Sequence, residues 1–410
     1  MKVLIISETF PPLIRASARI MKDLAVTFVE NGHEVSVVTF IENHNEFKHI
    51  TTGRFEENGY DVIRVKIPKQ RGVGYFRRGI TEELIPFIAT RKSLNYLKSE
   101  KFDLIVAHLP PLSICSMVKK LKKINNCPVY LLLRDIHPQT GVDLGIYKPG
   151  GIVYARFRYL EKKLYEISDV IAPQSPANRE FILKNNPDIS PEKVSVIYNF
   201  KNPDIEPTHS INFKDKLGLN GKTVCLYGGN MTSSQDLKEL LMVAQKCREL
   251  KDVVFLMIGF GKEREMLNQK ANEMGLTNII FEDPLPLDVF TSLVYQCDIG
   301  LMFLNKNFTT HNFPGKTLDY MNASLPIIAS VNVGNDLKQM IEKGANCGFV
   351  HYGDDLEGVA ESIKALAQDE NKRKMMGKNG RTYLENELNS KTAYDKIMSD
   401  INKLKGDNNA

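Results

Sequence analysis

Short apolar runs alternate with amphipathic segments along the first half of the chain. The amphipathic segment over 15–31 predicts a helix, and it ends at Asn31-Gly32, where glycine suits the left-handed cap. We predict strands at 3–7, 34–39, 61–67, 103–107, 128–133, 169–172 and 194–197. Strands that alternate with helices form a parallel, doubly wound sheet.

The same alternation begins again after residue 222. We predict strands at 223–229, 253–259, 278–281, 298–303 and 326–329, helices at 235–249, 262–274, 287–296 and 316–323, and a last helical stretch over 356–405. The polar, proline-containing segment 199–221 is predicted to be a linker. The sequence therefore predicts an α/β protein of two Rossmann-like domains, 1–199 and 200–385, with a C-terminal helix within 386–410 that packs back on the first domain.

The composition agrees with two globular domains. The 410 residues exceed the length of one ordinary core, and 42% hydrophobic with 25% charged residues is typical of a soluble protein. No run of about 18 apolar residues predicts a membrane-spanning helix, and no signal-peptide pattern precedes the first strand. The six cysteines lack ligand-like spacing, so we expect them to be reduced, in a cytoplasmic protein.

The positive charge is concentrated in the first half. Residues 1–200 contain 29 basic and 21 acidic residues, whereas 201–410 contain 25 and 28. A basic half predicts an anionic partner, either nucleic acid or a membrane surface, and no nucleic-acid-binding module is present. Two basic and aromatic runs, 64–78 and 148–163, favour a membrane surface over a merely solvated helix face. The membrane residues predicted in the first run are Arg71, Tyr75, Phe76, Arg77 and Arg78.

Loops that follow the strands of the second domain are candidates for phosphate binding, because ligands of open α/β sheets bind at the carboxyl ends of the strands. Gly228-Gly229-Asn230 begins one loop, which runs to Gln235, and its glycines let backbone approach a phosphate. Gly259-Phe260-Gly261 is a weaker signal of the same kind. Either loop also fits a tight turn with no ligand.

The most informative loop spans 305–321. Pro314-Gly315 opens a helix, whose free amide groups and Lys316 suit a diphosphate. Asp319 lies nearly one turn further on, where a carboxylate suits the diol of a ribose. The alternative is a salt-bridged surface turn with no ligand.

These motifs resemble those of the retaining glycosyltransferases of family 4, over nearly the whole chain. The stretches that carry the resemblance are 7–12, 229–235, 313–320 and 325–329. The likeness is greatest to the bacterial branch that builds O-antigen and capsule, including N-acetyl-L-fucosamine transferases of the WbuB type. It implies the GT-B architecture, with two domains facing across a cleft, a nucleoside diphosphate sugar such as a UDP-sugar as donor, and no metal or other cofactor.

The chain departs from the family pattern in its opening loop, where Ile14-Arg15-Ala16-Ser17 stands in place of a frequent glycine pair, and at four positions of the second domain. Two glutamates of the larger family are replaced by His311 and Asp319, and an Arg and a Lys of the glycine loop by Asn230 and Gln235. We therefore expect Lys316, together with the amides of Gly229 and Gly315, to bind the phosphates.

The resemblance also implies acceptor-side residues in the first domain. Arg15 and Ser17 lie at the first strand-to-helix turn, and His108, Asp135 and His137 follow two later strands. We expect His108 and Asp135 to orient the acceptor or the donor sugar. Alternatively, His108 is structural, and Asp135 pairs with Arg134 or His137 to hold its loop.

The function predicted is transfer of a sugar, such as N-acetyl-L-fucosamine, from a UDP-sugar to a polyprenyl-diphosphate-linked saccharide at the inner face of the plasma membrane. The predicted catalytic residues are His108, Asp135 and Lys316. Two alternatives stay open: a non-catalytic scaffold that binds sugar nucleotides, and a non-hydrolysing UDP-sugar 2-epimerase.

Overall fold

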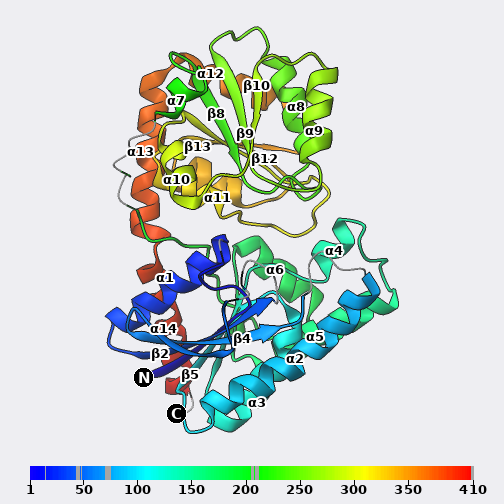
Figure 1. Cartoon of the computed structure of the whole chain (residues 1–410), viewed down its shortest axis with the longest axis vertical. Helices are drawn as coiled ribbons and strands as arrows, with labels where there is room; N and C mark the ends of the chain where they lie inside the picture. The colour runs from blue at the N-terminus through cyan, green and yellow to red at the C-terminus, as the bar shows by residue number, and fades with distance from the viewer. Residues whose placement is uncertain are drawn as a thin grey trace. The chain divides into compact units, whose positions relative to one another are not determined.

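A computed structural model describes residues 1–13, 15–42, 47, 49–69, 75–204, 207 and 212–407. The chain divides into two compact units (Figure 1). Unit 1 comprises Met1–Asn199 and Ser390–Ala410, and unit 2 comprises Phe200–Asn389. The chain thus leaves unit 1 at residue 199 and returns to it at residue 390.

Unit 1 is built on a seven-stranded sheet in the order β3-β4-β2-β1-β5-β6-β7. Its neighbouring strands are parallel, except that β3 runs antiparallel to β4. The strands are β1 (Lys2–Ser7), β2 (Glu34–Glu42), β3 (Gly53–Glu57), β4 (Tyr60–Ile67), β5 (Leu104–Leu109), β6 (Val129–Leu133) and β7 (Val170–Pro173). Nearly every residue of β1, β5 and β6 is buried, as expected for central parallel strands covered on both faces.

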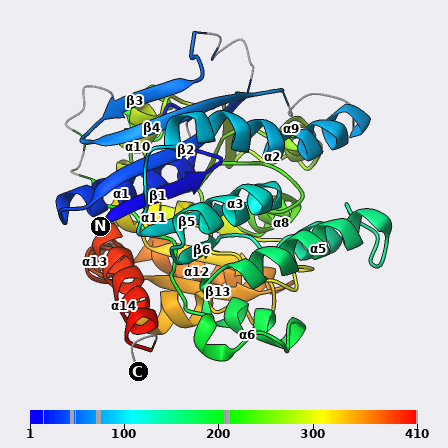
Figure 2. The same ribbon diagram turned by 90° about the horizontal axis from the view of Figure 1, so that it is seen from below.

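Helices cover both faces of this sheet. The helices are α1 (Ala16–Glu30), α2 (Tyr75–Leu97), α3 (Cys115–Asn125), α4 (Gln139–Asp143), α5 (Ile152–Ile167), α6 (Pro176–Asn185) and α14 (Ser390–Asp407), with short 3₁₀ turns at Leu112–Ile114 and Pro191–Lys193. Apolar side chains of α2, α3 and α5 share one core with the strands. On the other side α1 packs against α14 (Figure 2).

The C-terminal helix α14 is anchored to unit 1 by polar contacts as well as by packing. The Tyr130 hydroxyl donates to Asp400 at 2.8 Å, and the His33 ring lies 2.8 Å from the Tyr394 hydroxyl. Tyr130 is fully buried, so this hydrogen bond also satisfies a polar group in the core.

Unit 2 has a six-stranded sheet in the order β10-β9-β8-β11-β12-β13, and all its pairs are parallel. The strands are β8 (Thr223–Gly228), β9 (Val253–Ile258), β10 (Ile279–Glu282), β11 (Ile299–Phe303), β12 (Ile327–Val331) and β13 (Gly348–Tyr352). The helices are α7 (Phe213–Lys216), α8 (Leu237–Lys246), α9 (Arg264–Glu273), α10 (Leu287–Tyr295), α11 (Lys316–Asn322), α12 (Leu356–Gln368) and α13 (Glu370–Glu387), with a π-helical turn at Gln339–Gly344. Helices α8, α9 and α12 share one core with the sheet.

The two parallel-sheet α/β units and the last helical stretch are as the sequence predicts, but one predicted strand is absent and two strands are additional. Residues 194–197 form an isolated bridge and no strand: Val194 pairs with Ile171, and the Ser195 and Ile197 amides donate to the carbonyls of Ile171 and Pro173 in β7. Strands β3 and β13 are absent from the predicted elements. The helical stretch 356–405 is three helices, because the Asp369 side chain caps a new helix by accepting from the Lys372 amide, and a further break precedes Ser390.

Candidate functional site

Two glycine loops of unit 2 are locked together at the carboxyl edge of its sheet. The Gly229 amide donates to the Ile258 carbonyl at 2.9 Å, and the Met231 amide donates to the Phe260 carbonyl at 2.8 Å. Gly259 has a φ of +148°, and a Cβ there would lie 1.9 Å from the Gly229 oxygen. The glycines of this Gly-x-Gly sequence are therefore required by backbone-to-backbone contact.

This arrangement corrects one expectation. The Gly229 amide is already engaged with Ile258, so it is not available to bind a phosphate. Glycine is favoured at position 229 by its φ of +127°, and a Cβ there would be in ordinary contact with the Lys316 Nζ, at 3.5 Å.

Lys316 is the most unusual charged group of unit 2. Its ammonium lies 3.6 Å from the centroid of the Tyr227 ring and has no hydrogen-bond or ion-pair partner among the described residues. Burial lowers the pKa of Lys316 to about 7, and the nearby Asp319 carboxylate opposes this shift. A buried cation without a counter-ion is unfavourable, so this position is suited to an anionic ligand.

The start of helix α11 is held in place by Tyr320. The Tyr320 hydroxyl accepts a hydrogen bond from the Gly228 amide and lies 3.1 Å from the carbonyl oxygens of Leu226 and Leu301. One buried hydroxyl thus connects α11 to β8 and β11. Because α11 begins at Lys316, this contact helps to hold the lysine beside Gly229.

Asp319 has a partner that the sequence pattern does not indicate. Its Oδ1 lies 2.9 Å from the Nζ of Lys201, which also contacts Asp204 at 2.8 Å. Lys201 is only 5% exposed. No local pattern signals this pair, because 118 positions separate the two residues. The ribose contact of Asp319 stays a prediction.

The other residues predicted to bind the sugar-nucleotide donor differ in their contacts and in their exposure. The Gln235 side-chain oxygen accepts from the Thr232 hydroxyl at 2.8 Å, so Gln235 stabilises its own turn. Asn230 is exposed, and its carbonyl accepts from the Tyr227 hydroxyl at 2.6 Å. The His311 ring lies beside Gly334, where an added Cβ would be 3.7 Å from the ring. Pro314 and Gly315 immediately precede α11, as predicted.

In unit 1, His108 is buried near the first turn. Its Nδ1 lies 3.5 Å from the Ser7 hydroxyl, and its Nε2 has no partner among the described residues. Burial, and then the nearby Arg134 cation, lower the pKa of His108 to about 3. The imidazole is therefore neutral at physiological pH.

Arg134 and Asp135 do not pair directly. One Arg134 nitrogen donates to the Ile197 carbonyl at 2.6 Å, and its Nε and Nη2 atoms have no partner among the described residues. Burial lowers the pKa of Arg134 to about 10 and raises that of Asp135 to about 6. Asp135 is half-buried, which leaves part of its carboxylate accessible.

The other acceptor-side residues are dispersed. The Ser17 hydroxyl lies 2.7 Å from that of Thr9, in the turn that also holds Ser7. Arg15 is exposed at the N-terminus of α1. His137 packs edge-on against Tyr147 and Phe157, with ring centroids 5.4 and 4.8 Å apart.

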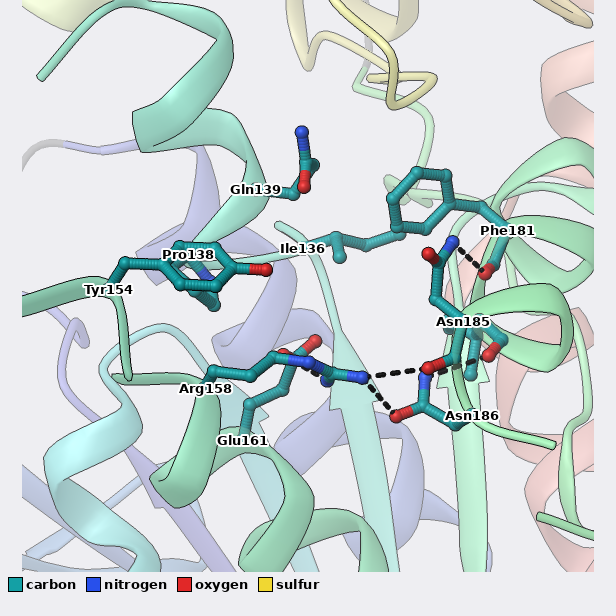
Figure 3. A pocket seen from close by; sticks show the side chains of 10 residues that line it. Ile136, Pro138, Gln139, Tyr154, Arg158, Glu161, Phe181, Asn185 and Asn186 are labelled. Atoms are coloured by element: carbon teal, nitrogen blue, oxygen red, sulfur yellow. Dashed lines mark hydrogen bonds and ion pairs between the residues drawn. The ribbon is translucent and has the colours of Figure 1, made fainter. Parts of the chain in front are cut away.

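A small pocket of about 30 Å³ lies among α4, α5 and α6, beginning one residue after Asp135 (Figure 3). Its lining is Ile136, Pro138, Gln139, Tyr154, Arg158, Glu161, Phe181, Ile182, Asn185 and Asn186. Arg158 contacts Glu161 at 2.5 Å and donates to the Asn186 side chain at 2.6 Å. Because these polar groups satisfy one another, the pocket by itself does not call for a charged ligand.

The predicted membrane segment is only partly described. Arg71, and the side chains of Tyr75, Phe76, Arg77 and Arg78, lie outside the described residues. In the second basic run, α5 exposes Ile152 by 91% and Val153 by 53%. Within the described part of the chain, no helix is long and apolar enough to span a bilayer, and no cluster of three or more His, Cys, Asp or Glu forms a candidate metal site.

Comparisons with known proteins assign the two halves of the chain. Residues 17–204 match the family model described as Glycosyltransferase Family 4, and residues 222–369 match the model Glycosyl transferases group 1. The chain carries both domains of a glycosyltransferase. The family 4 model thus covers the first domain, and the second domain matches the group 1 model.

Curated relatives and solved structures agree with this assignment. An uncharacterised glycosyltransferase of Methanocaldococcus jannaschii is 24% identical, over 90% of each chain, and the putative colanic acid biosynthesis glycosyl transferase WcaI of Escherichia coli is 19% identical, over 98% of this chain and 100% of that one. Sucrose-phosphate synthase from Thermosynechococcus elongatus has a TM-score of 0.75 at 16% identity, covering 99% of both chains. HepE of Anabaena, solved with UDP and glucose, has a TM-score of 0.72 at 16% identity, covering 98% of this chain and 100% of that one. The fold is GT-B.

Proposed function

We propose that this glycosyltransferase moves a sugar from a UDP-sugar to a saccharide carried on a polyprenyl diphosphate, with retention of configuration and without a metal ion. The proposed sugar is an N-acetylated amino sugar such as N-acetyl-L-fucosamine, as in transferases of the WbuB type, and the proposed process is O-antigen or capsule assembly. The two domains support the reaction class. The UDP bound to HepE supports a UDP-linked donor, and the resemblance of the motifs supports the sugar and the acceptor.

The unpaired ammonium of Lys316 is the observation that carries the donor site. It lies beside Gly229, at the edge of the sheet where nucleotides bind in open α/β folds. A diphosphate at this position would supply the counter-ion that the described residues do not. The amides of Thr317, Leu318 and Asp319 donate within this turn, so the amides that precede Thr317 would add donors to the same phosphates.

In the proposed reaction, the charge of Lys316 stabilises the leaving group. As the bond between the anomeric carbon and the donor phosphate breaks, negative charge gathers on the leaving diphosphate, and Lys316 stabilises it. The acceptor hydroxyl attacks from the same face, and its proton passes to the leaving phosphate oxygen. In unit 1, the neutral His108 and the half-buried Asp135 would orient the reacting sugars.

A membrane-bound acceptor is supported by the surface of α5. Exposed Ile152 and Val153 lie between Lys148 and Arg156, and no acidic residue occurs from 144 to 160. Exposed apolar side chains next to basic ones favour the interface of an anionic membrane. The proposed location is the inner face of the plasma membrane, with the protein held at the surface.

The test is a two-stage measurement. A panel of UDP-sugars is first screened for thermal stabilisation of the chain, because a bound donor raises the melting temperature. The best donor is then incubated in excess EDTA with polyprenyl-diphosphate-linked saccharides, and the products and their anomeric configuration are determined. Activity that is lost in EDTA and restored by Mn²⁺ or Mg²⁺ would refute the metal-free mechanism. Donor binding without transfer to any acceptor would favour the non-catalytic scaffold.

A further inference from the structure

Phe260 is an exposed aromatic ring held on a rigid loop. It lies between Gly259 and Gly261, in the loop that joins β9 to α9. The side chain is 62% exposed, whereas the other aromatic side chains in the described part of unit 2 are buried or half-buried. Leaving a large apolar ring in water is unfavourable, and a single exposed ring gains stability if a ligand covers it.

The two flanking glycines leave Phe260 as the only side chain at this point of the loop. Gly259 and Gly261 have φ values of +148° and +151°, and a Cβ at Gly261 would lie 2.1 Å from the Met231 carbonyl. The Phe260 carbonyl accepts from the Met231 amide at 2.8 Å. The backbone that carries the ring is therefore fixed against the β8 loop, which limits the conformational freedom that a bound ligand would have to remove.

The loop that carries the ring lies close, in the fold, to the proposed phosphate position. Gly259 touches Gly229, and Gly229 is in turn the residue beside the Lys316 ammonium. In the sheet, β9 and β11 flank β8 on opposite sides. Phe260 and Lys316 thus follow strands on either side of the Gly229 loop.

From this geometry we propose that Phe260 is the stacking surface for the nucleobase of the donor. The inference rests on the proposed donor site, because it takes the phosphates to lie at Lys316. An aromatic face stacks on any base, so Phe260 contributes affinity without choosing between uracil and guanine. The two residues then bind different parts of the nucleotide: Lys316 binds the charged diphosphate, and Phe260 stacks on the flat face of the base.

The absence of tryptophan from the whole chain makes a direct test possible. The variant Phe260→Trp contains a single indole at the proposed stacking position, and a stacked base should quench its fluorescence. Phe87→Trp is the matched control, since Phe87 is 68% exposed on α2 of unit 1. We expect UMP and UDP to quench Phe260→Trp in a saturable way, pyrophosphate to leave it unchanged, and neither to affect Phe87→Trp.

Calorimetry on the full chain supplies the second measurement. We expect Phe260→Ala to weaken UDP binding by about tenfold and to leave pyrophosphate binding unchanged, with Phe260→Tyr close to the wild type. If UDP binds the wild type but neither quenches Phe260→Trp nor binds Phe260→Ala more weakly, the stacking role is wrong and the donor site stands. If neither UDP nor GDP binds the wild type, the proposed donor site itself is refuted, and the stacking role falls with it.

Discussion

The titration of Lys316 gives the sharpest test of the donor site. In the ligand-free protein, burial lowers the pKa of Lys316 to about 7. A bound diphosphate places negative charge beside the ammonium and must raise this pKa. Below pH 7 the lysine is already charged and UDP binds at full strength. Above pH 7 binding must first take up a proton, so the affinity for UDP falls as the pH rises.

The size of the effect follows from the pKa. With a pKa of about 7, roughly nine tenths of the ligand-free molecules carry a neutral Lys316 at pH 8, against about one tenth at pH 6. We therefore expect uptake of about 0.9 proton per UDP bound at pH 8, and about a tenfold loss of affinity between pH 6 and pH 8, before the titration of UDP itself is subtracted.

The assay is calorimetry in pairs of buffers that differ in ionisation enthalpy, which reports the number of protons taken up. Lys316→Arg is the matched control, because a guanidinium stays charged throughout this range. The proton uptake measured with this variant therefore comes from the phosphate of UDP itself. The difference in proton uptake between wild type and Lys316→Arg at pH 8 should approach one. Equal uptake by the two proteins would refute a partly neutral Lys316 next to the bound phosphates.

Three further predictions test separate parts of the molecule. Asp319→Ala should weaken binding of UDP by about 2 kcal/mol in calorimetry if the carboxylate binds the ribose, and unchanged affinity would refute the ribose contact and favour a structural role that includes the ion pair with Lys201. Gly259→Ala should lower the melting temperature by several degrees, because its methyl group would collide with the Gly229 carbonyl; a melting curve identical to that of the wild type would contradict the close contact. A double variant with Ile152→Glu and Val153→Glu should no longer co-sediment with anionic vesicles, whereas Met242→Glu, at a 47% exposed apolar position in unit 2, should sediment like the wild type.

The sequence by itself determined the elements whose evidence is local. Alternating apolar strands and amphipathic helices, with a polar linker near residue 200, were enough to predict two parallel-sheet domains. The position of Lys316 at the start of a helix was predicted from Pro314-Gly315 for the same reason, because helix starts depend on a few neighbouring residues.

Only the tertiary structure decided what those residues contact. The pairing of Asp319 with Lys201, the collision that excludes a side chain at Gly259, and the burial that shifts the pKa of Lys316 all involve groups from different strands and loops. The sequence also left open whether Asp135 pairs with Arg134. In the structure, Arg134 donates to the Ile197 carbonyl, 63 positions away. Such contacts depend on how separate elements meet at the sheet edge, and no pattern within a single element specifies that meeting.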